Sequence, residues 1–352
     1  MADFPTATRV LDEAIAARVF PGAVVEIGRT AGPVATISRG SLTYSEGAAL
    51  VADTSIYDLA SLTKVLATAA LMVAQLDRDR MRLNDRVDHW IDSWTGEERQ
   101  AVTIRDLLEH CSGLPGHRRY FETRRGRASY ELAICEEPLE YATRTTSIYS
   151  DPGFMLLGFA IENAAGAPLD CLFDRWRDQE LGSRVELRFL VHRSAEREGG
   201  RPPAGWLERT APTEAEAAGE ATRGVVHDEN AAALGGVAGH AGLFGTAAAV
   251  GACARWWLGS AALPRFAQRS ATPGSSRALG WDTMLPASSC GTKLSPQAIG
   301  HTGFTGTSLW IDPAQDLYVA FLSNRVHPTR EGEGIQQARR ALHDAVVTDL
   351  SE

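Results

Sequence analysis

The sequence has few features that point to a membrane, and its charge disfavours nucleic acid. It contains no run of about 18 apolar residues, so no membrane-spanning helix is expected. Acidic residues outnumber basic ones by 44 to 35, and the formal net charge is −9. Because nucleic-acid phosphates are bound by clustered Lys and Arg, this surface should repel them. The basic stretch at 118–127 is interpreted as a solvated loop.

Cysteine is also scarce, with five residues scattered along the chain and no CxxC pair. An odd number of dispersed cysteines favours free thiols in a reducing compartment over a disulfide framework. The first 20 residues include Asp3, Asp12 and Glu13 and lack the apolar core of a secretory signal. We therefore expect a cytoplasmic location, or a periplasmic one if an export signal has been removed.

The sequence contains no recognisable metal motif. His227, Asp228 and His240 invite a metal interpretation, but HExxH is absent and no close pair of ligands exists. The glycine-dense loop at 235–245 lacks the Lys-Ser/Thr ending of a phosphate-binding loop. We expect no metal and no cofactor, and we expect this loop to pack near the functional site, with His240 supporting its wall.

The order of sequence periodicities predicts an α/β fold of the α+β type. Strand-like runs lie near both ends of the chain, at 22–28, 34–38, 298–302, 307–311 and 317–323. Helical periodicity marks the first 17 residues, 65–76 and 335–350, and much of the middle is helical in pattern. This order predicts one antiparallel sheet that is built from both termini and flanked by helices, with a mainly helical insertion.

The length of 352 residues allows two folding units at about 100–200 residues each. We place a sheet domain at 1–75 and 275–352 and a mainly helical domain at 76–274, with a long loop near 192–223. Thr103 and Thr246 are expected to cap helices, and Pro152 is expected in the first turn of another.

Ser61-Leu-Thr-Lys64 lies at the start of the predicted helix 65–76. A serine hydroxyl is a poor nucleophile unless a base and a positive field lie close to it. Residues three apart share a helix face, which puts Lys64 beside Ser61, and a helix N-terminus supplies a partial positive charge. The motif is weak alone, because it often occurs by chance and a capping serine beside a solvated lysine is the simpler interpretation.

Two further motifs follow in order. Tyr149-Ser-Asp151 precedes Pro152, and His301-Thr302-Gly303 opens the C-terminal strands. Together with Ser61-Leu-Thr-Lys64, they resemble the serine β-lactamase and penicillin-binding protein family, in the branch of class C β-lactamases, DD-peptidases and related esterases. Flanking segments at 20–25, 107–115 and 242–246 are also similar to that family.

The resemblance implies a β-lactamase/transpeptidase-like fold and acyl-enzyme chemistry. Ser61 would attack a carbonyl, and Lys64 and Tyr149 would share the proton transfer. Either one remains open as the base, because a desolvated Lys64 can lose its proton or its charge can lower the Tyr149 pKa. The backbone N–H groups of Ser61 and Phe304 would form the oxyanion hole, and Gly303 would let the strand approach the substrate.

Other residues implied in substrate binding include departures from the family pattern. Asp151 stands where relatives often have Asn, and it either contacts substrate or caps the helix at Pro152. His301, beside Thr302, stands where many relatives have Lys, and it is charged only near or below pH 6.5 if unperturbed. That weakens the carboxylate preference of a β-lactamase. Trp281 is either a cleft residue or a core aromatic.

We therefore expect a serine hydrolase that forms an acyl-enzyme on Ser61 and cleaves a small ester or amide. Esterase or DD-peptidase-like activity ranks above true β-lactamase activity, because antibiotics and intact cell wall lie outside the cytoplasm. Two alternatives use the same residues: a catalytically weak penicillin-binding or sensing module, and an acyltransferase. The sequence leaves the substrate and the oligomeric state open.

Overall fold

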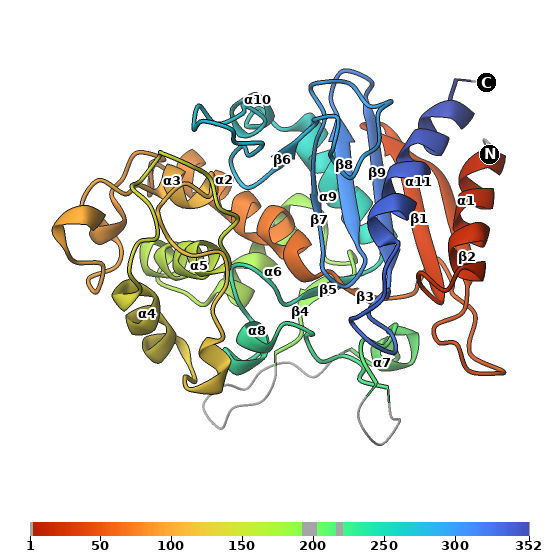
Figure 1. The fold of residues 1–352 in the computed structure, drawn as a ribbon, viewed down its shortest axis with the longest axis horizontal. Coiled ribbons are helices and arrows are strands. Elements are labelled where there is room, and N and C mark those ends of the chain that lie inside the picture. Colours follow the sequence, from red (N-terminus) through yellow and green to blue (C-terminus); the bar gives the residue numbers. More distant parts are fainter. Residues whose placement is uncertain (1–2, 192–202, 216–220, 352) are drawn as a thin grey trace.

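The fold is built around a six-stranded antiparallel sheet in the order β2-β1-β9-β8-β7-β6 (Figure 1). The computed structural model describes residues 3–191, 203–215 and 221–351. The strands are β1 (Gly22–Arg29), β2 (Gly32–Gly40), β6 (Asp282–Thr283), β7 (Ile299–Thr302), β8 (Ser308–Asp312) and β9 (Leu317–Ser323). Because β1 pairs with β9, the prediction of one antiparallel sheet built from both termini is confirmed.

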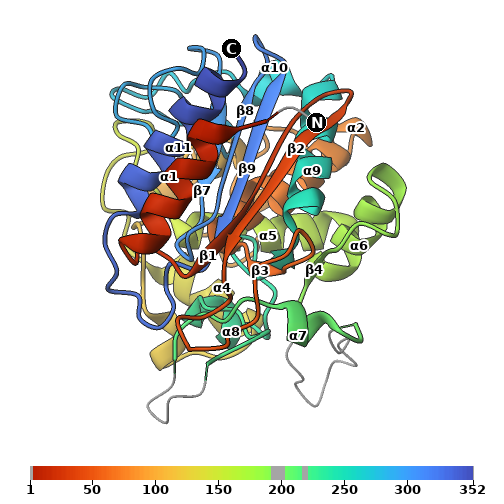
Figure 2. The same ribbon diagram turned by 90° about the vertical axis from the view of Figure 1, so that its right-hand side faces the viewer.

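Helices cover both faces of this sheet. α1 (Pro5–Ala16) and α11 (Ile335–Asp349) lie side by side on one face, and α9 (Ala247–Gly259) lies on the other (Figure 2). The alternation along β1 follows from the strand period of two: Val25 belongs to the core under α1 and α11, and Val24 belongs to the core under α9. Burial of both faces explains why the β1 and β9 patterns are almost continuously apolar.

The middle of the chain forms the helical part of the fold. α5 (Asp151–Ala165) lies at the centre of this part, and most of its residues are buried. Around it lie α2 (Ala69–Asp77), α3 (Ile104–Leu108), α4 (Arg127–Glu136), α6 (Leu169–Glu180), α7 (Trp206–Arg209), α8 (Glu229–Ala233) and α10 (Leu263–Phe266). A small sheet, in the order β3-β5-β4, joins β3 (Tyr57–Asp58), β5 (Leu243–Gly245) and β4 (Leu187–Phe189).

The helix starts test the capping predictions. Thr103 and Asp106 form a capping box at α3, and the Thr246 side chain accepts a hydrogen bond from the Ala249 N–H at α9, so both predictions are confirmed. The capping alternative for Asp151 is wrong. Ser150 has an extended backbone and accepts the Gly153 N–H, so it is the cap, and Asp151 already lies inside the helix with its side chain free for other partners.

The division into domains at 1–75, 76–274 and 275–352 stays a prediction. Part of the predicted loop at 192–223 lies outside the described residues, and its described part contains α7. Among the described helices, no single one combines the length and apolar composition of a membrane span. α5 and α6 meet that test only as a pair, and the two are bent by 74°.

Candidate active site

The Ser61 turn connects the small sheet to the helical part of the fold. Ser61 lies in the 3-10 turn Ala60–Leu62, which is followed by the π-helical turn Lys64–Thr68 and then α2. Ala60 has a positive φ of 47°, a conformation that residues with a side chain rarely adopt. The Asp58 carboxylate accepts the Ala60 N–H at 2.8 Å and holds this strained backbone in place. Such strain is typical of functional turns, where the surrounding structure over-determines the conformation.

Lys64 is fully buried and lies one turn behind Ser61. Its Nζ donates to Ser61 Oγ at 3.0 Å, to Asp151 Oδ1 at 2.8 Å and to the His240 carbonyl at 3.2 Å. An ammonium group has three donors and no acceptor, so these three partners match a charged lysine. Burial would lower the pKa of Lys64, but the interactions with Asp151 and Tyr149 together outweigh burial and raise this pKa. Lys64 is therefore a cation beside Ser61.

Tyr149 lies against this cation. The Lys64 Nζ is 4.7 Å from the centroid of the Tyr149 ring. Burial raises the pKa of the Tyr149 hydroxyl, although interactions with Lys64 and Ser61 pull it down. The His110 ring packs on Tyr149 with centroids 4.7 Å apart, and its Nδ1 accepts the Ser150 N–H at 2.9 Å. His110 therefore holds both the ring and the backbone of the Tyr149 segment.

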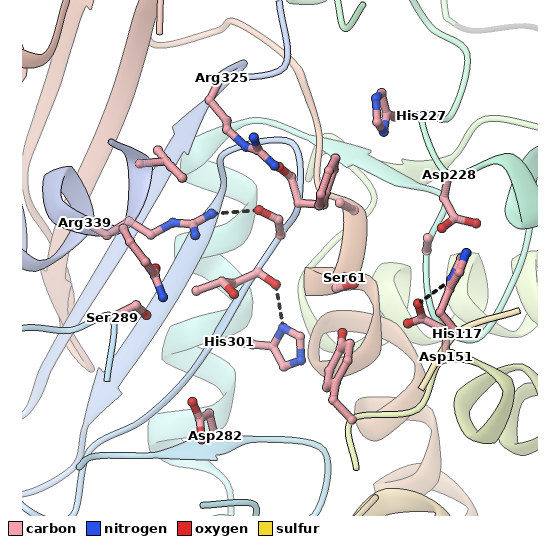
Figure 3. A pocket seen from close by; sticks show the side chains of 18 of the residues that line it. Ser61, His117, Asp151, His227, Asp228, Asp282, Ser289, His301, Arg325 and Arg339 are labelled. Carbon is pink, nitrogen blue, oxygen red and sulfur yellow. Dashed lines mark hydrogen bonds and ion pairs between the residues drawn. The ribbon is translucent and has the colours of Figure 1, made fainter. Parts of the chain in front are cut away.

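Asp151 joins Lys64 to the mouth of the site. One carboxylate oxygen pairs with Lys64, and the other lies 3.6 Å from Nδ1 of the half-exposed His117 (Figure 3). Burial would raise the pKa of Asp151, but the Lys64 charge and the contact with His117 lower it far below its usual value. Asp151 is consequently an anion that balances Lys64.

His301 differs from the expectation of a group that titrates near pH 6.5. Its ring is buried, and Nδ1 donates to the Thr302 carbonyl at 2.8 Å, which leaves Nε2 as an acceptor (Figure 3). Burial, reinforced by the Lys64 and Arg277 charges, lowers the His301 pKa well below its usual value. His301 is thus a neutral imidazole.

The turn between β7 and β8 packs directly against the Ser61 turn. A Cβ on Gly303 would lie 2.6 Å from the Leu59 carbonyl oxygen, so only glycine fits this approach. Thr305 Oγ1 donates to the Asp58 carbonyl at 2.7 Å, and Thr307 Oγ1 donates to the Leu59 carbonyl at 3.1 Å. These contacts bring the Phe304 backbone to the same wall as Ser61.

A cavity of about 710 Å³ opens over these groups. Its lining contains most of the residues predicted for the site, namely Ser61, Tyr149, Asp151, His301, Thr302, Gly303 and Phe304. Trp281 is different, since it is fully buried in the core with its ring 5.4 Å from that of Trp257. His240 contributes its carbonyl to Lys64, while its Nε2 lies 2.8 Å from Asp228 Oδ1.

Several cavity residues were missed by the sequence analysis, namely His117, Arg277, Arg325 and Arg339. Asp228 also lines the cavity, and the sequence analysis considered it only as a metal ligand. The only available signal was the position of His117, two residues after the 107–115 segment that resembles the family. Within the described ranges, no group of three or more His, Cys, Asp or Glu side chains could hold a metal ion.

Comparisons with known proteins show the family and the fold of this chain. A sequence model of the Beta-lactamase family matches residues 7–343. A "Putative D-alanyl-D-alanine carboxypeptidase" of Escherichia coli K12 is 30% identical over 316 residues, which cover 78% of this chain and 70% of the relative.

Solved structures share the fold. EstCE1, "a hydrolase with promiscuous acyltransferase activity", aligns with a TM-score of 0.75 at 19% identity, covering 97% of this chain and 98% of EstCE1. Simvastatin synthase (LovD) from Aspergillus terreus aligns with a TM-score of 0.76 at 17% identity, covering 99% of both chains. The chain therefore belongs to the beta-lactamase family, in the branch of class C β-lactamases, DD-peptidases and esterases, and is a hydrolase of that family.

Proposed function

We propose that this protein is a serine hydrolase that forms an acyl-enzyme on Ser61 and cleaves a small ester or amide. The observation that carries the proposal is the buried, charged Lys64, whose Nζ lies 3.0 Å from Ser61 Oγ. A cation held at that distance stabilises the negative charge that develops on Oγ during attack. A solvated lysine beside a capping serine would not be fully buried and paired with Asp151.

The proposed proton path runs through Tyr149. Lys64 uses all its donors on acceptors and has no free lone pair, so it is a poor acceptor for the Ser61 proton. In acylation, Ser61 Oγ bonds to the carbonyl carbon while Tyr149 Oη takes the Ser61 proton and passes its own to the leaving group, whose bond to the carbonyl carbon breaks. In deacylation, water adds to the acyl carbon, the bond from this carbon to Ser61 Oγ breaks, and a water proton returns through Tyr149 to Ser61 Oγ. This relay needs no preformed phenolate, consistent with the raised pKa of Tyr149.

The substrate class is proposed from the relatives and from the charges in the cavity. One relative is named as a putative carboxypeptidase, and EstCE1 is named as a hydrolase with acyltransferase activity. His301 is neutral, but Arg277 lines the same cavity and lies 5.1 Å from the Tyr149 ring centroid. Arg277 can supply the fixed positive charge that His301 lacks, which keeps a carboxylate-bearing amide within the proposed range beside simple esters.

A substrate panel tests this function. Chromogenic esters, D-amino-acid amides and a cephalosporin would be assayed with wild type, Ser61→Ala and Ser183→Ala, the last being a control at an exposed serine. We expect turnover of at least one ester or amide by wild type and the control, and none by Ser61→Ala. Unchanged turnover in Ser61→Ala would contradict the proposal.

Intact-mass measurement separates the proposal from its two alternatives. With labelled penicillin, a long-lived adduct on Ser61 without turnover of any panel substrate would indicate a binding or sensing module instead of a hydrolase. With a chromogenic ester and an added alcohol, accumulation of the transferred ester in preference to the free acid would indicate an acyltransferase. A transient adduct followed by release of the free acid supports the hydrolase.

A further inference from the structure

Arg339 on α11 is a buried cation whose role the proposed chemistry leaves open. Its side chain is 5% exposed, and the described part of the chain offers it no carboxylate partner. One terminal nitrogen, Nη2, donates to the Gly303 carbonyl at 2.7 Å and to the Thr307 carbonyl at 2.8 Å (Figure 3). Burial of a guanidinium without an anion is unfavourable, so stability alone does not account for this residue.

The two carbonyls belong to the turn between β7 and β8, where each also accepts a backbone hydrogen bond: Gly303 from the Gly306 N–H at 3.1 Å and Thr307 from the Gly303 N–H at 2.7 Å. Side chains add a second set of hydrogen bonds to this turn. Five of the six carbonyls from 302 to 307 accept a hydrogen bond from a side-chain donor. The pairs are Thr302 with His301, Gly303 and Thr307 with Arg339, Phe304 with Arg325, and Gly306 with Ser323. In an ordinary hairpin turn, backbone and solvent do most of this work. This turn is therefore fixed from outside by groups on β9, α11 and the segment that follows β9.

The direction of one peptide group connects this clamp to the candidate oxyanion hole. In a trans peptide, the carbonyl and the N–H of the next residue point in opposite directions. Arg339 pulls the Gly303 carbonyl toward α11, so the Phe304 N–H must point away from α11. The Gly303 backbone lies against Leu59 and Ala60, the residues before Ser61. The side of this peptide that faces away from Arg339 is therefore next to the Ser61 turn.

We propose that Arg339 is a positioning residue that aims the Phe304 N–H at the oxyanion formed during attack by Ser61. This inference rests on the proposed function. The guanidinium acts in two ways, since it fixes the peptide plane and also polarises it, which makes the N–H a stronger donor. Arg325 supports the same turn, because its Nε donates to the Phe304 carbonyl at 2.8 Å.

The competing role for Arg339 is direct binding of a substrate anion. The residue lines the cavity, and its Nε has no hydrogen-bond partner among the described residues. The two roles predict different kinetics. An oxyanion-positioning group acts only in the transition state, so its loss lowers kcat for every substrate. An anion-binding group acts on the ground state as well, so its loss raises KM for anionic substrates alone.

The test compares 4-nitrophenyl acetate with the succinate half-ester of 4-nitrophenol, using wild type, Arg339→Met and Arg339→Lys. For Arg339→Met we expect kcat to fall about 10²-fold on both esters with little change in KM, near the lower range for loss of an oxyanion donor. Affinity for a phenylboronic acid should fall by a similar factor, because its tetrahedral adduct uses the same donor. Arg339→Lys should recover part of the loss.

Arg340→Met is the matched control, because Arg340 lies on the same helix and also donates to carbonyls, those of Ser288 and Pro286. It should leave kcat and boronate affinity unchanged. If Arg339→Met fails to fold, as judged by circular dichroism, Arg325→Gln tests the same turn through Phe304. It should lower kcat and boronate affinity together by a smaller factor.

The outcomes separate the two proposals. Wild type must show Ser61-dependent turnover and boronate inhibition, and their absence would overturn the proposed function together with this inference. If both are present, a rise in KM confined to the succinate half-ester, or unchanged kcat and boronate affinity in the Arg339 and Arg325 variants, would overturn the positioning role alone.

Discussion

The two walls of the cavity carry positive charge in different ways. One wall, here called the helical wall, is formed by the Ser61–Lys64 turn and the start of α5. There the Lys64 charge is neutralised by Asp151, and all three donors of Lys64 are used within the protein. The other wall, here called the sheet wall, is formed by β7, the turn that follows it and α11. There Arg339 is buried without an anion among the described residues, and its hydrogen bonds go to backbone carbonyls. The helical wall is balanced before substrate arrives, which suits proton transfer between neutral partners. The sheet wall keeps an unneutralised field, which suits stabilisation of an oxyanion.

The largest effect is expected when the balanced wall loses its cation. Lys64→Met should lower kcat/KM by at least about 10³-fold, because the field at Ser61 and the position of its hydroxyl are lost together. It should also lower the free energy of unfolding by about 3–5 kcal/mol, since the Asp151 carboxylate is left without its partner. Urea denaturation and ester hydrolysis measure the two effects.

The double variant K64M/D151N sharpens this result. It removes both charges, so most of the lost stability should return while activity stays low. If the double variant is no more stable than Lys64→Met, the Lys64 and Asp151 charges do not neutralise each other as described for the helical wall.

A smaller effect is expected when only the anion is removed. In Asp151→Asn, burial of Lys64 is no longer opposed by a carboxylate, so its pKa should fall from its raised value. Because the proposed relay needs Lys64 charged, the alkaline limb of the kcat/KM profile should move to lower pH than in wild type. Rates from pH 6 to 11 measure this shift.

His117→Gln is the control for that shift, because His117 contacts the other oxygen of Asp151 and leaves the Lys64 pair intact. In this variant the alkaline limb of the kcat/KM profile should not move to lower pH. An alkaline limb that stays in place in Asp151→Asn would mean that Lys64 is not needed as a cation.

The same contrast explains what could be predicted from the sequence. The helical wall is encoded in short motifs, because Ser61 and Lys64 are one turn apart and Tyr149 is next to a helix start. That both ends of the chain contribute strands to one sheet also followed from where the apolar runs lie, although the β1–β9 pairing itself was not predicted. Arg339 and Arg277 have no local pattern, since their role depends on which turn or ring they meet after folding. Asp151 was ambiguous because it could either contact substrate or cap α5. The structure removes the capping role, because Ser150 has the extended backbone of the cap and accepts the Gly153 N–H.

The smallest expected effect concerns Asp58, which touches both walls. Its carboxylate accepts the Ala60 N–H on the Ser61 side, and its backbone carbonyl accepts Thr305 Oγ1 from the sheet side. Burial raises its pKa from 3.8 to about 6, although backbone hydrogen bonds from His227 and Ala60 oppose the shift. The folded state then binds a proton more tightly than the unfolded state. The contribution of Asp58 to stability is therefore highest at low pH and declines as pH rises through this window.

Asp58→Asn removes that titration. It tests whether the carboxylate of Asp58, a residue that contacts both walls, is destabilised by its burial. The stability of wild type relative to the variant should fall as pH rises from 3.8 to about 6 and then stay level. Urea denaturation of both proteins at a series of pH values measures this difference, and other titrating groups cancel because both proteins contain them. A difference that is constant or rises across the window would show that the two backbone N–H groups stabilise the Asp58 carboxylate at least as much as its burial destabilises it. The Asp58 carboxylate would then not be destabilised in the folded state, and the strain at the Ser61 turn would be confined to the Ala60 backbone.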